Sequence, residues 1–562
     1  MKSILPDILN TKNADIIISY FQNLLDIEIS SNEDLEVFFQ DVSRLESAVS
    51  EEMAWRYIKM TCNTQDQEIE KSYLEFVQEI QPKVAPIEDQ LNIKIVDTKF
   101  SKSFEDNQAY FIYLRSLRSA VDLFREKNIS IQSELSTLAS EYSAIQGKQT
   151  IVWEGETITL QRASNILLTP NRVNREKIWN LIWERRKKDV DALEDIFDKM
   201  VAKRHEMAVN AGFENYRDYK FVSLGRFDYN VEDCKEFHNS IEKFVVPIQK
   251  KVMQHRRELM GHDLKPWDTA VDPLGREALH PFENGADLLA KSIKVLDRLD
   301  PFFGDCLRTM ESNSLLDLDS RIGKAPGGYN YPLAQTNMPF IFMNATSNLR
   351  DVETLLHEAG HAIHSFQMAP LPLNAFKDTP SEVAELASMS MELLSMSAWD
   401  EFFSGDDLKR ALAEQLEGVI STLPWIATID AFQHWIYENP THTRDERREY
   451  WKSLQQRFGT GMVNYTGIES ALDYTWHRQL HLFEVPFYYI EYGIAQLGAI
   501  GIWKNYMTGD NPQLALDQYK NFMKLGYMKS IPEIYEEAGV KLDFSARYIQ
   551  ELMSFVESQW EK

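Results

Sequence analysis

The sequence predicts a mainly α-helical fold, because helical periodicity covers most of the chain and strand patterns are few. Between about residues 13 and 143, apolar side chains recur at the spacing of a helix face, as in ADIIISYFQNLLDIEI, and few glycines interrupt them. Long helical patterns resume at Asn174 and, beyond the loop LKPWDTAVDPLGREALHPFENGAD and a short strand, continue to about residue 558. We expect an N-terminal helical domain over residues 1–190 and a second domain over residues 191–562.

Two short segments depart from the helical pattern. KQTIVWEGETITLQRA alternates apolar and polar residues around the turn Glu154-Gly155-Glu156, which predicts one β-hairpin in the N-terminal domain. PFIFMN, residues 339–344, predicts a short strand, and the glycine-bearing stretch KAPGGYNYP before it predicts a mobile loop. We expect this loop to lead into an edge strand.

Composition and charge narrow the classes of partner. The 562 residues, 44% hydrophobic and 26% charged, suit a globular chain with more than one core. Because 86 acidic residues outnumber 60 basic ones, the net charge of −26 repels nucleic acid and anionic membranes. We therefore expect neither partner. The sequence carries no signal that sets the oligomeric state.

The cellular compartment is predicted from the first residues and from the cysteines. Pro6, Asp7 and Asp15 lie where a signal peptide would be apolar, and no later run approaches about 18 apolar residues, so we expect a cytoplasmic protein. The cysteines are widely spaced and form no CxxC motif, which argues against a disulfide framework and against a thiolate metal site. We expect plain buried thiols at all three positions, Cys62, Cys234 and Cys306.

The segment LLHEAGHAIHSF contains the motif HExxH. His357 and His361 are one helical turn apart, so both imidazoles lie on one face and can bind a single zinc ion. Glu358 follows the first histidine, where its carboxylate can accept a proton from zinc-bound water. The apolar stripe around the motif predicts a buried helix, in which two unsatisfied histidines would be costly. Core histidines bonded to carbonyl groups are the alternative. Metzincins are excluded, since His364 and Gln367 occupy the positions where that family needs glycine and histidine.

A catalytic zinc site needs a third protein ligand. The segment DTPSEVAELASMSMELLSMSAWDEF predicts a helix beginning near Pro380 and carries Glu382, Glu385 and Glu392. Glu385 and Glu392 are seven residues apart and share a face, and the small residues Ala384, Ala387 and Ser388 favour close helix packing. One carboxylate can bind zinc while the other hydrogen-bonds to a ligand histidine. Glu382 better suits a solvated charge at a helix start, and periodicity alone leaves the choice of ligand open.

A third segment, WHRQLHLFEVPFYYIEYGIAQ, combines His481 with a group of tyrosines. Tyr488 and Tyr492 share one helix face, and Tyr489 lies between them in the sequence. Such an aromatic stripe is more often part of a core than of a catalytic site. An imidazole and a phenol can nevertheless stabilise the oxyanion formed when a peptide bond is hydrolysed.

HEAGHAIHS followed by AELASMSMELL resembles the M3 metallopeptidases, the group of thimet oligopeptidase, oligoendopeptidase F and bacterial Pz-peptidase-like enzymes. The resemblance spans about residues 195 to 555. It implies that Glu385 is the third zinc ligand and Glu392 the carboxylate that holds a ligand histidine. It also implies that His481 acts on the oxyanion with Tyr492 or, as second choice, Tyr489.

The same resemblance implies a two-lobed helical fold with a deep substrate channel and a small β-sheet beside the HExxH helix. The KAPGGYNYP loop and the PFIFMNA strand look like the family's flexible loop and the sheet edge along which substrate lies. We expect a zinc-dependent oligoendopeptidase that binds one Zn²⁺ per chain and hydrolyses internal bonds of short unfolded peptides. The alternatives are a catalytically silent peptide-binding or scaffold protein, and a metallo-carboxypeptidase.

Overall fold

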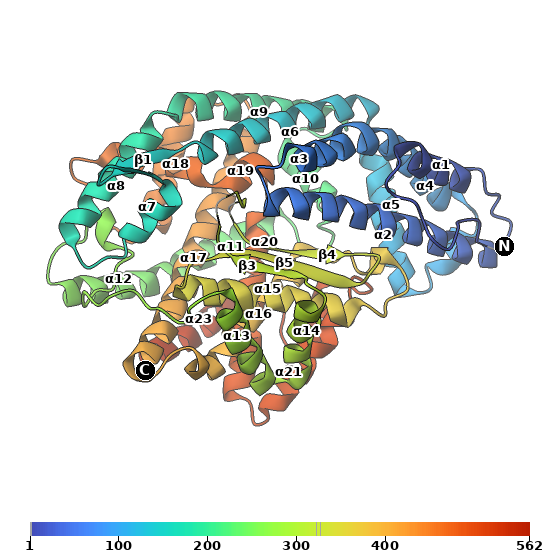
Figure 1. Ribbon diagram of the computed structural model, residues 1–562. Coiled ribbons are helices and arrows are strands. Elements are labelled where there is room, and N and C mark those ends of the chain that lie inside the picture. Colours follow the sequence, from blue (N-terminus) through green and yellow to red (C-terminus); the bar gives the residue numbers. More distant parts are fainter. Residues whose placement is uncertain (1–2, 322, 326) are drawn as a thin grey trace. The chain divides into compact units, whose positions relative to one another are not determined.

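The computed structural model describes residues 3–321, 323–325 and 327–562, and helices dominate it (Figure 1). The chain folds into two compact units, each built from three separate segments. Unit 1 combines the chain up to Glu126 with His280–Ala411 and Ala495–Leu542, and unit 2 combines Lys127–Leu279, Leu412–Ile494 and Asp543–Lys562. The domain boundary predicted near residue 190 lies inside unit 2. The division into an N-terminal and a C-terminal domain at that residue stays a prediction.

The elements of unit 1 are helices and one three-stranded sheet. They are α1 (Ala14–Leu25), α2 (Asn32–Cys62), α3 (Gln67–Glu75), α4 (Gln81–Asp97), α5 (Gln108–Leu123), α13 (Gly285–Leu299), α14 (Pro301–Ser312), β3 (Leu316–Asp319), β4 (Tyr329–Leu333), β5 (Met338–Ala345), α15 (Leu349–Met368), α16 (Ser381–Ser395), α21 (Pro512–Met523) and α22 (Ile531–Glu537).

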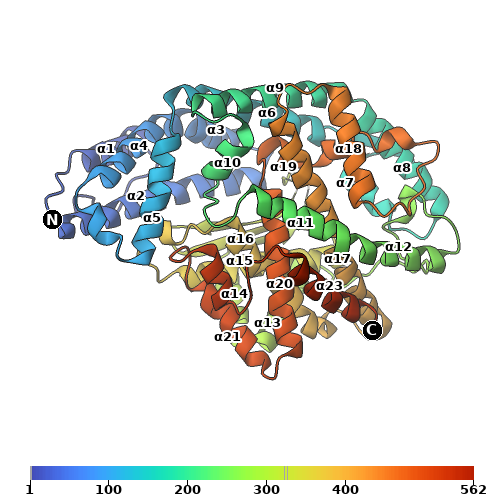
Figure 2. The ribbon, with the colours of Figure 1, turned by 180° about the vertical axis from the view of Figure 1, so that it is seen from behind.

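The elements of unit 2 are helices and one hairpin. They are α6 (Glu126–Gly147), β1 (Thr150–Trp153), β2 (Glu156–Thr159), α7 (Leu160–Ile166), α8 (Arg172–Lys187), α9 (Val190–Asn210), α10 (Tyr216–Ser223), α11 (Val231–Phe244), α12 (Val246–Met260), α18 (Arg444–Phe458), α19 (Leu480–Glu484) and α23 (Ala546–Trp560). Within unit 2, α11 packs against α12 and α23 (Figure 2). Helix α6 begins with Glu126, a residue of unit 1, and α17 (Gly405–Glu438) and α20 (Tyr489–Thr508) also contain residues of both units.

Helices α1, α2, α4 and α5 form one hydrophobic core of unit 1. Apolar residues at helical spacing point inward from each of them, among them Phe21, Phe38 and Leu91, all nearly inaccessible to solvent. Ser31 caps the long α2 by accepting a hydrogen bond from the Asp34 amide. The helical pattern predicted for residues 13–143 is thereby confirmed.

The predicted β-hairpin is also confirmed. β1 and β2 pair antiparallel with Trp153 opposite Glu156. The two turn residues, Glu154 and Gly155, both have positive φ angles, 51° and 87°. A two-residue hairpin turn of this type needs positive φ at both positions, which explains the glycine.

The segment PFIFMN forms a strand as predicted, but it is not an edge strand. It belongs to β5, which lies in the middle of the sheet order β3-β5-β4, parallel to β3 and antiparallel to β4. Its consecutive apolar residues Phe340, Ile341 and Phe342 are all buried, which is typical of a strand covered on both faces. A peptide could therefore add to β3 or β4 but not to β5.

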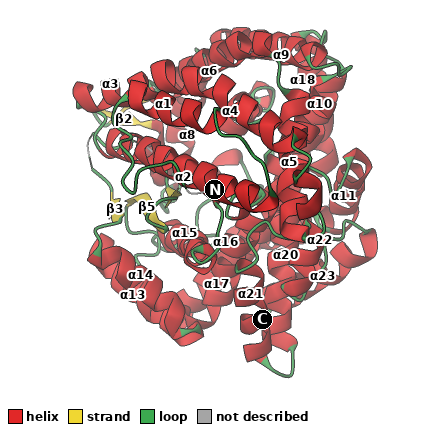
Figure 3. Ribbon diagram, turned by 90° about the vertical axis from the view of Figure 1, so that its right-hand side faces the viewer, coloured by secondary structure: helices red, strands yellow, loops and turns green. Residues whose placement is uncertain are grey.

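The sheet lies beside the HExxH helix, as expected: α15 packs against β5, β4 and α16. Figure 3 shows β5, α15 and α16 close to one another. Of the predicted KAPGGYNYP loop, Pro326 lies outside the described residues, as does Ile322 just before it.

Over residues 3–321, 323–325 and 327–562, no helix is both long and apolar enough to cross a bilayer. Within the described residues no cysteine forms a disulfide, and Cys62 is only partly buried, unlike Cys234 and Cys306.

Candidate metal centre

Helix α15 forms where the sequence predicts it and carries the HExxH motif. Asn348 caps it by accepting from the Asp351 amide, and the Asp351 carboxylate accepts from the Asn348 amide in return. Apolar residues such as Leu355 are fully buried. The helix therefore holds His357 and His361 on one face, with ring centroids 4.9 Å apart.

Helix α16 begins at Ser381, directly after Pro380, as predicted. It approaches α15 so closely that a Cβ atom on Gly360 would lie 2.6 Å from the Ser388 Cα and 2.8 Å from the Ala387 carbonyl oxygen. Tyr519 of α21 donates a hydrogen bond of 2.6 Å to that same carbonyl oxygen. Gly360 therefore allows the close packing together with the small residues predicted on α16. Gly360 was not among the residues predicted to matter. A glycine inside a helical pattern can indicate that another backbone packs closely against it.

This packing brings three metal-binding side chains together in unit 1. The Nε2 atoms of His357 and His361 lie 3.4 Å and 3.6 Å from the same Glu385 oxygen, Oε2. Potential ligand atoms of all three residues lie within 4.8 Å of one another. Two imidazole nitrogens and one carboxylate oxygen form a donor set that suits Zn²⁺ and leaves a fourth position open. Ser388 donates a hydrogen bond of 3.0 Å to Glu385 Oε2 and so holds the carboxylate in place.

Glu392 orients one of the histidines. Its Oε1 lies 2.7 Å from Nδ1 of His357. A carboxylate at Nδ1 keeps the ring proton on that atom and leaves Nε2 as a lone-pair donor. Glu385 and Glu392, seven residues apart on α16, therefore both contact His357 and share a face as expected.

The ionisation of the site reflects two carboxylates placed close to two buried histidines. Burial tends to raise the pKa of Glu385, but His361 and His357 bring it down to about 2, so this group is a carboxylate at neutral pH. Burial lowers the pKa of His361 to about 4, which keeps its imidazole neutral. Burial also opposes a proton on His357, yet hydrogen bonds to Glu385 and Glu392 raise its pKa well above the usual range. The carboxylates of Glu385 and Glu392 thus favour a positive charge at His357.

Glu358 directly follows the candidate ligand His357 on α15 and is 7% exposed. Burial raises the pKa of its carboxyl group to about 7, with the negative charges of Glu385 and Glu392 adding to the shift. A group with this pKa exchanges protons readily near neutral pH. Asn330 of β4 donates a hydrogen bond of 3.2 Å to the Glu358 backbone carbonyl, which ties the helix to the sheet at this residue.

Two polar residues near the motif are more buried than the sequence suggests. Glu382 is 3% exposed, so its interpretation as a solvated charge is wrong: Tyr535 of α22 packs there and donates a hydrogen bond of 3.0 Å to the Glu382 carbonyl. His364 is also buried, next to the Phe522 ring, and burial lowers its pKa to about 3. Neither residue belongs to the ligand group.

The other predicted site residues gather in unit 2. The His481 ring lies 4.9 Å from that of Tyr489, 5.8 Å from that of Tyr492 and 6.0 Å from that of Tyr488, measured between centroids. Gln479 donates from its amide nitrogen to His481 Nδ1 at 2.7 Å, which places the proton of a neutral ring on Nε2. The His481 ring can therefore act as a hydrogen-bond donor, as the predicted role requires.

Two buried arginines hold this histidine–tyrosine segment. Arg204 donates to the Leu482 carbonyl at 2.9 Å and also to the carbonyl of the next residue. Arg226 pairs with Glu491 at 3.0 Å and donates to the carbonyl of Phe487, whose φ of 67° is unusual for a bulky residue. Sequence reasoning missed both arginines, because their partners are more than 260 positions away in the chain.

Comparison with known proteins agrees with the fold and the motifs. Bacillus subtilis oligopeptidase PepF is 25% identical over 345 residues, which cover 59% of this chain and 49% of that protein. An oligoendopeptidase F homolog of Lactococcus lactis is 24% identical over 319 residues, covering 56% and 51%. The chain thus spans about half the length of these curated relatives. The solved structure of PZ peptidase A with inhibitor 2 matches with a TM-score of 0.91 and 26% identity, over 99% of this chain and 98% of that one.

Two family descriptions also match the sequence. Residues 11–124 match the peptidase M3 N-terminal domain, and residues 166–554 match peptidase family M3 itself. The second match covers the HExxH helix, the helix with Glu385 and the histidine–tyrosine segment. The resemblance and the mainly α fold predicted from the sequence are both confirmed. This chain belongs to peptidase family M3.

Proposed function

We propose that this protein is a zinc-dependent oligoendopeptidase, which cuts internal bonds of short unfolded peptides. The observation that carries the proposal is the convergence of His357, His361 and Glu385 beside a buried carboxyl group, Glu358. The names of the relatives, oligopeptidase and oligoendopeptidase, support the substrate class. The deep substrate channel, which the family resemblance implies, and the cytoplasmic location stay predictions.

In this proposal His357, His361 and Glu385 would hold one zinc ion. When bound, Zn²⁺ supplies a Lewis acid that polarises the peptide carbonyl and lowers the pKa of water. Glu358 would accept a proton from the attacking water and pass it to the leaving amine, a role for which a buried carboxyl group next to His357 is suited. Glu392 keeps His357 in the tautomer that can bind metal.

Internal cleavage separates this function from its alternatives. We expect the zinc-loaded protein to cut an internally quenched peptide of about ten residues whose two ends are both blocked, because an endopeptidase needs no free terminus. Mass spectrometry of the fragments would give the bond cut. The same peptide with a free carboxyl terminus is the matched control. Release of single C-terminal residues from that control alone would indicate a carboxypeptidase, and binding of both peptides without cleavage would indicate a scaffold protein.

The role of the tyrosines is a separate prediction from the family resemblance. We expect Tyr492→Phe to lower kcat by about 10²-fold with little change in zinc content, since loss of one oxyanion donor costs roughly this much. Tyr488→Phe removes a hydroxyl from the same aromatic group and should have a much smaller effect. Steady-state kinetics of both variants and of Tyr489→Phe checks this assignment. A large loss in Tyr489→Phe alone would move the role to that residue.

A further inference from the structure

A second group of metal-binding side chains lies in unit 2. Helix α11 carries Cys234 and His238 four residues apart, and α17 carries Asp430 and His434 at the same spacing. Residues four apart lie on one helix face, so each helix presents a pair. A hydrogen bond of 2.8 Å between His238 Nε2 and Asp430 Oδ2 joins the two helices at this point.

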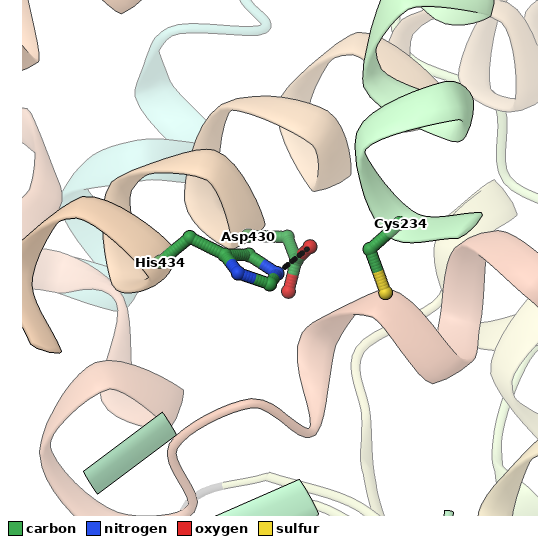
Figure 4. A group of neighbouring side chains, drawn as sticks. All are labelled: Cys234, Asp430 and His434. Carbon is green, nitrogen blue, oxygen red and sulfur yellow. Dashed lines mark ion pairs between the residues drawn. The ribbon is translucent and has the colours of Figure 1, made fainter. Parts of the chain in front are cut away.

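Three of these side chains point toward the same small region (Figure 4). Potential ligand atoms of Cys234, Asp430 and His434 lie within 4.8 Å of one another. The exposed fractions are 0%, 0% and 4%. His434 Nε2 lies 3.2 Å from Asp430 Oδ2, as the dashed line in Figure 4 marks. The group is therefore compact and shielded from water.

The hydrogen bonding of this group is incomplete. Asp430 Oδ1 and both ring nitrogens of His434 are buried without a hydrogen-bond partner among the described residues, and the 3.2 Å contact lacks hydrogen-bond geometry. Buried polar atoms are rarely left in this state, because losing water without a replacement is costly. Packing of α11 against α17 alone does not explain why Asp430 Oδ1 and the His434 ring lack hydrogen-bond partners.

We propose that Cys234, Asp430 and His434 bind a second metal ion, for which Zn²⁺ is the best fit. A bound cation would satisfy Asp430 Oδ1 and one of the two unsatisfied ring nitrogens of His434 at once. A thiolate and a carboxylate together balance the charge of a divalent ion, which permits burial, and the thiol proton leaves to solvent on binding. Sulfur and imidazole ligands select zinc over magnesium or calcium. His238 holds the other oxygen of Asp430 and orients the carboxylate, as a partner of a metal ligand does.

This site does not depend on the proposed peptidase function. It would cross-link α11 to α17 inside unit 2, so its role is structural. The group at His357, His361 and Glu385 contains no sulfur. A signal that arises from sulfur bound to metal therefore reports on the second site alone.

Cobalt(II) provides that signal, because a thiolate bound to Co²⁺ gives a charge-transfer absorption in the near ultraviolet that nitrogen and oxygen ligands do not give. We expect the full-length protein, stripped with a chelator and titrated with Co²⁺ alone, to develop this band and to bind two metal ions per chain. Cys234→Ser should lose the band and one metal ion. Cys306→Ser, which removes another buried thiol, should keep both.

A second variant keeps the proposal testable if Cys234→Ser does not fold. In Cys62→Ser/Cys306→Ser, Cys234 is the remaining cysteine of the chain, so the band must persist there at full strength. The proposal is overturned if cobalt gives no such band in the unmodified protein, if the band survives Cys234→Ser, or if it disappears from the double variant.

Discussion

Glu358→Gln is expected to lower kcat by about 10²–10⁴-fold, the usual contribution of a general base. The amide is close in size to the carboxyl group but cannot accept and return a proton. Zinc content should not change, because the proposed ligands are His357, His361 and Glu385. Cleavage of the doubly blocked peptide, measured together with bound zinc, checks both statements.

The control for this variant is Glu353→Gln on the same helix. Glu353 is also a buried glutamate of α15, but its partner is Arg350 at 3.3 Å and it lies outside the ligand group. Its kcat should stay near that of the unmodified enzyme. If Glu358→Gln keeps its zinc and its full activity, Glu358 is not the base. If it loses zinc, the residue acts on the metal site itself.

The second large effect is expected for Glu385→Gln. Loss of the carboxylate removes one of three ligands and the negative charge that both histidines face. Zinc affinity should fall by more than about 10²-fold, since even partners outside the ligand set contribute 10- to 100-fold. Zinc content at low free metal should drop by one ion per chain, and peptidase activity should disappear with it. Metal analysis after dialysis, followed by kinetics, measures both.

Glu382→Gln is the matched control, because Glu382 is a buried glutamate one turn earlier on the same helix. It should keep its zinc. Circular dichroism of both variants shows whether the protein as a whole stays folded. Full zinc in Glu385→Gln together with loss in Glu382→Gln would reverse the assignment of the third ligand.

Sequence reasoning succeeded where a local pattern specifies the structure. The hairpin follows from alternation around Glu154 and Gly155, whose positive φ angles the turn requires. The HExxH helix follows from its apolar stripe. These features depend on residues close together in the chain, within a few helical turns or one pair of strands. The local sequence is therefore sufficient to predict them.

Sequence reasoning failed where partners come from elsewhere in the chain. PFIFMN was predicted as an edge strand, yet β3 and β4 occupy both of its edges. Glu382 was interpreted as a solvated charge, but α22 covers it. In both cases the local pattern predicts the strand or the helix correctly. It does not predict which segments cover that element, because burial depends on packing between segments that are distant in the chain.

The sequence by itself determined the main class of fold, the family, and the residue types of the candidate metal site. Periodicity and motif spacing are local properties of the chain, and any helix through the HExxH motif puts His357 and His361 on one face. Only the tertiary structure decided that Glu385 faces both histidines, that Glu392 holds one of them, and that Cys234 meets Asp430 and His434. Cys234 and Asp430 are almost 200 positions apart and share no motif. A site of this kind arises when two helices pack, and the order of residues along the chain does not reveal that packing.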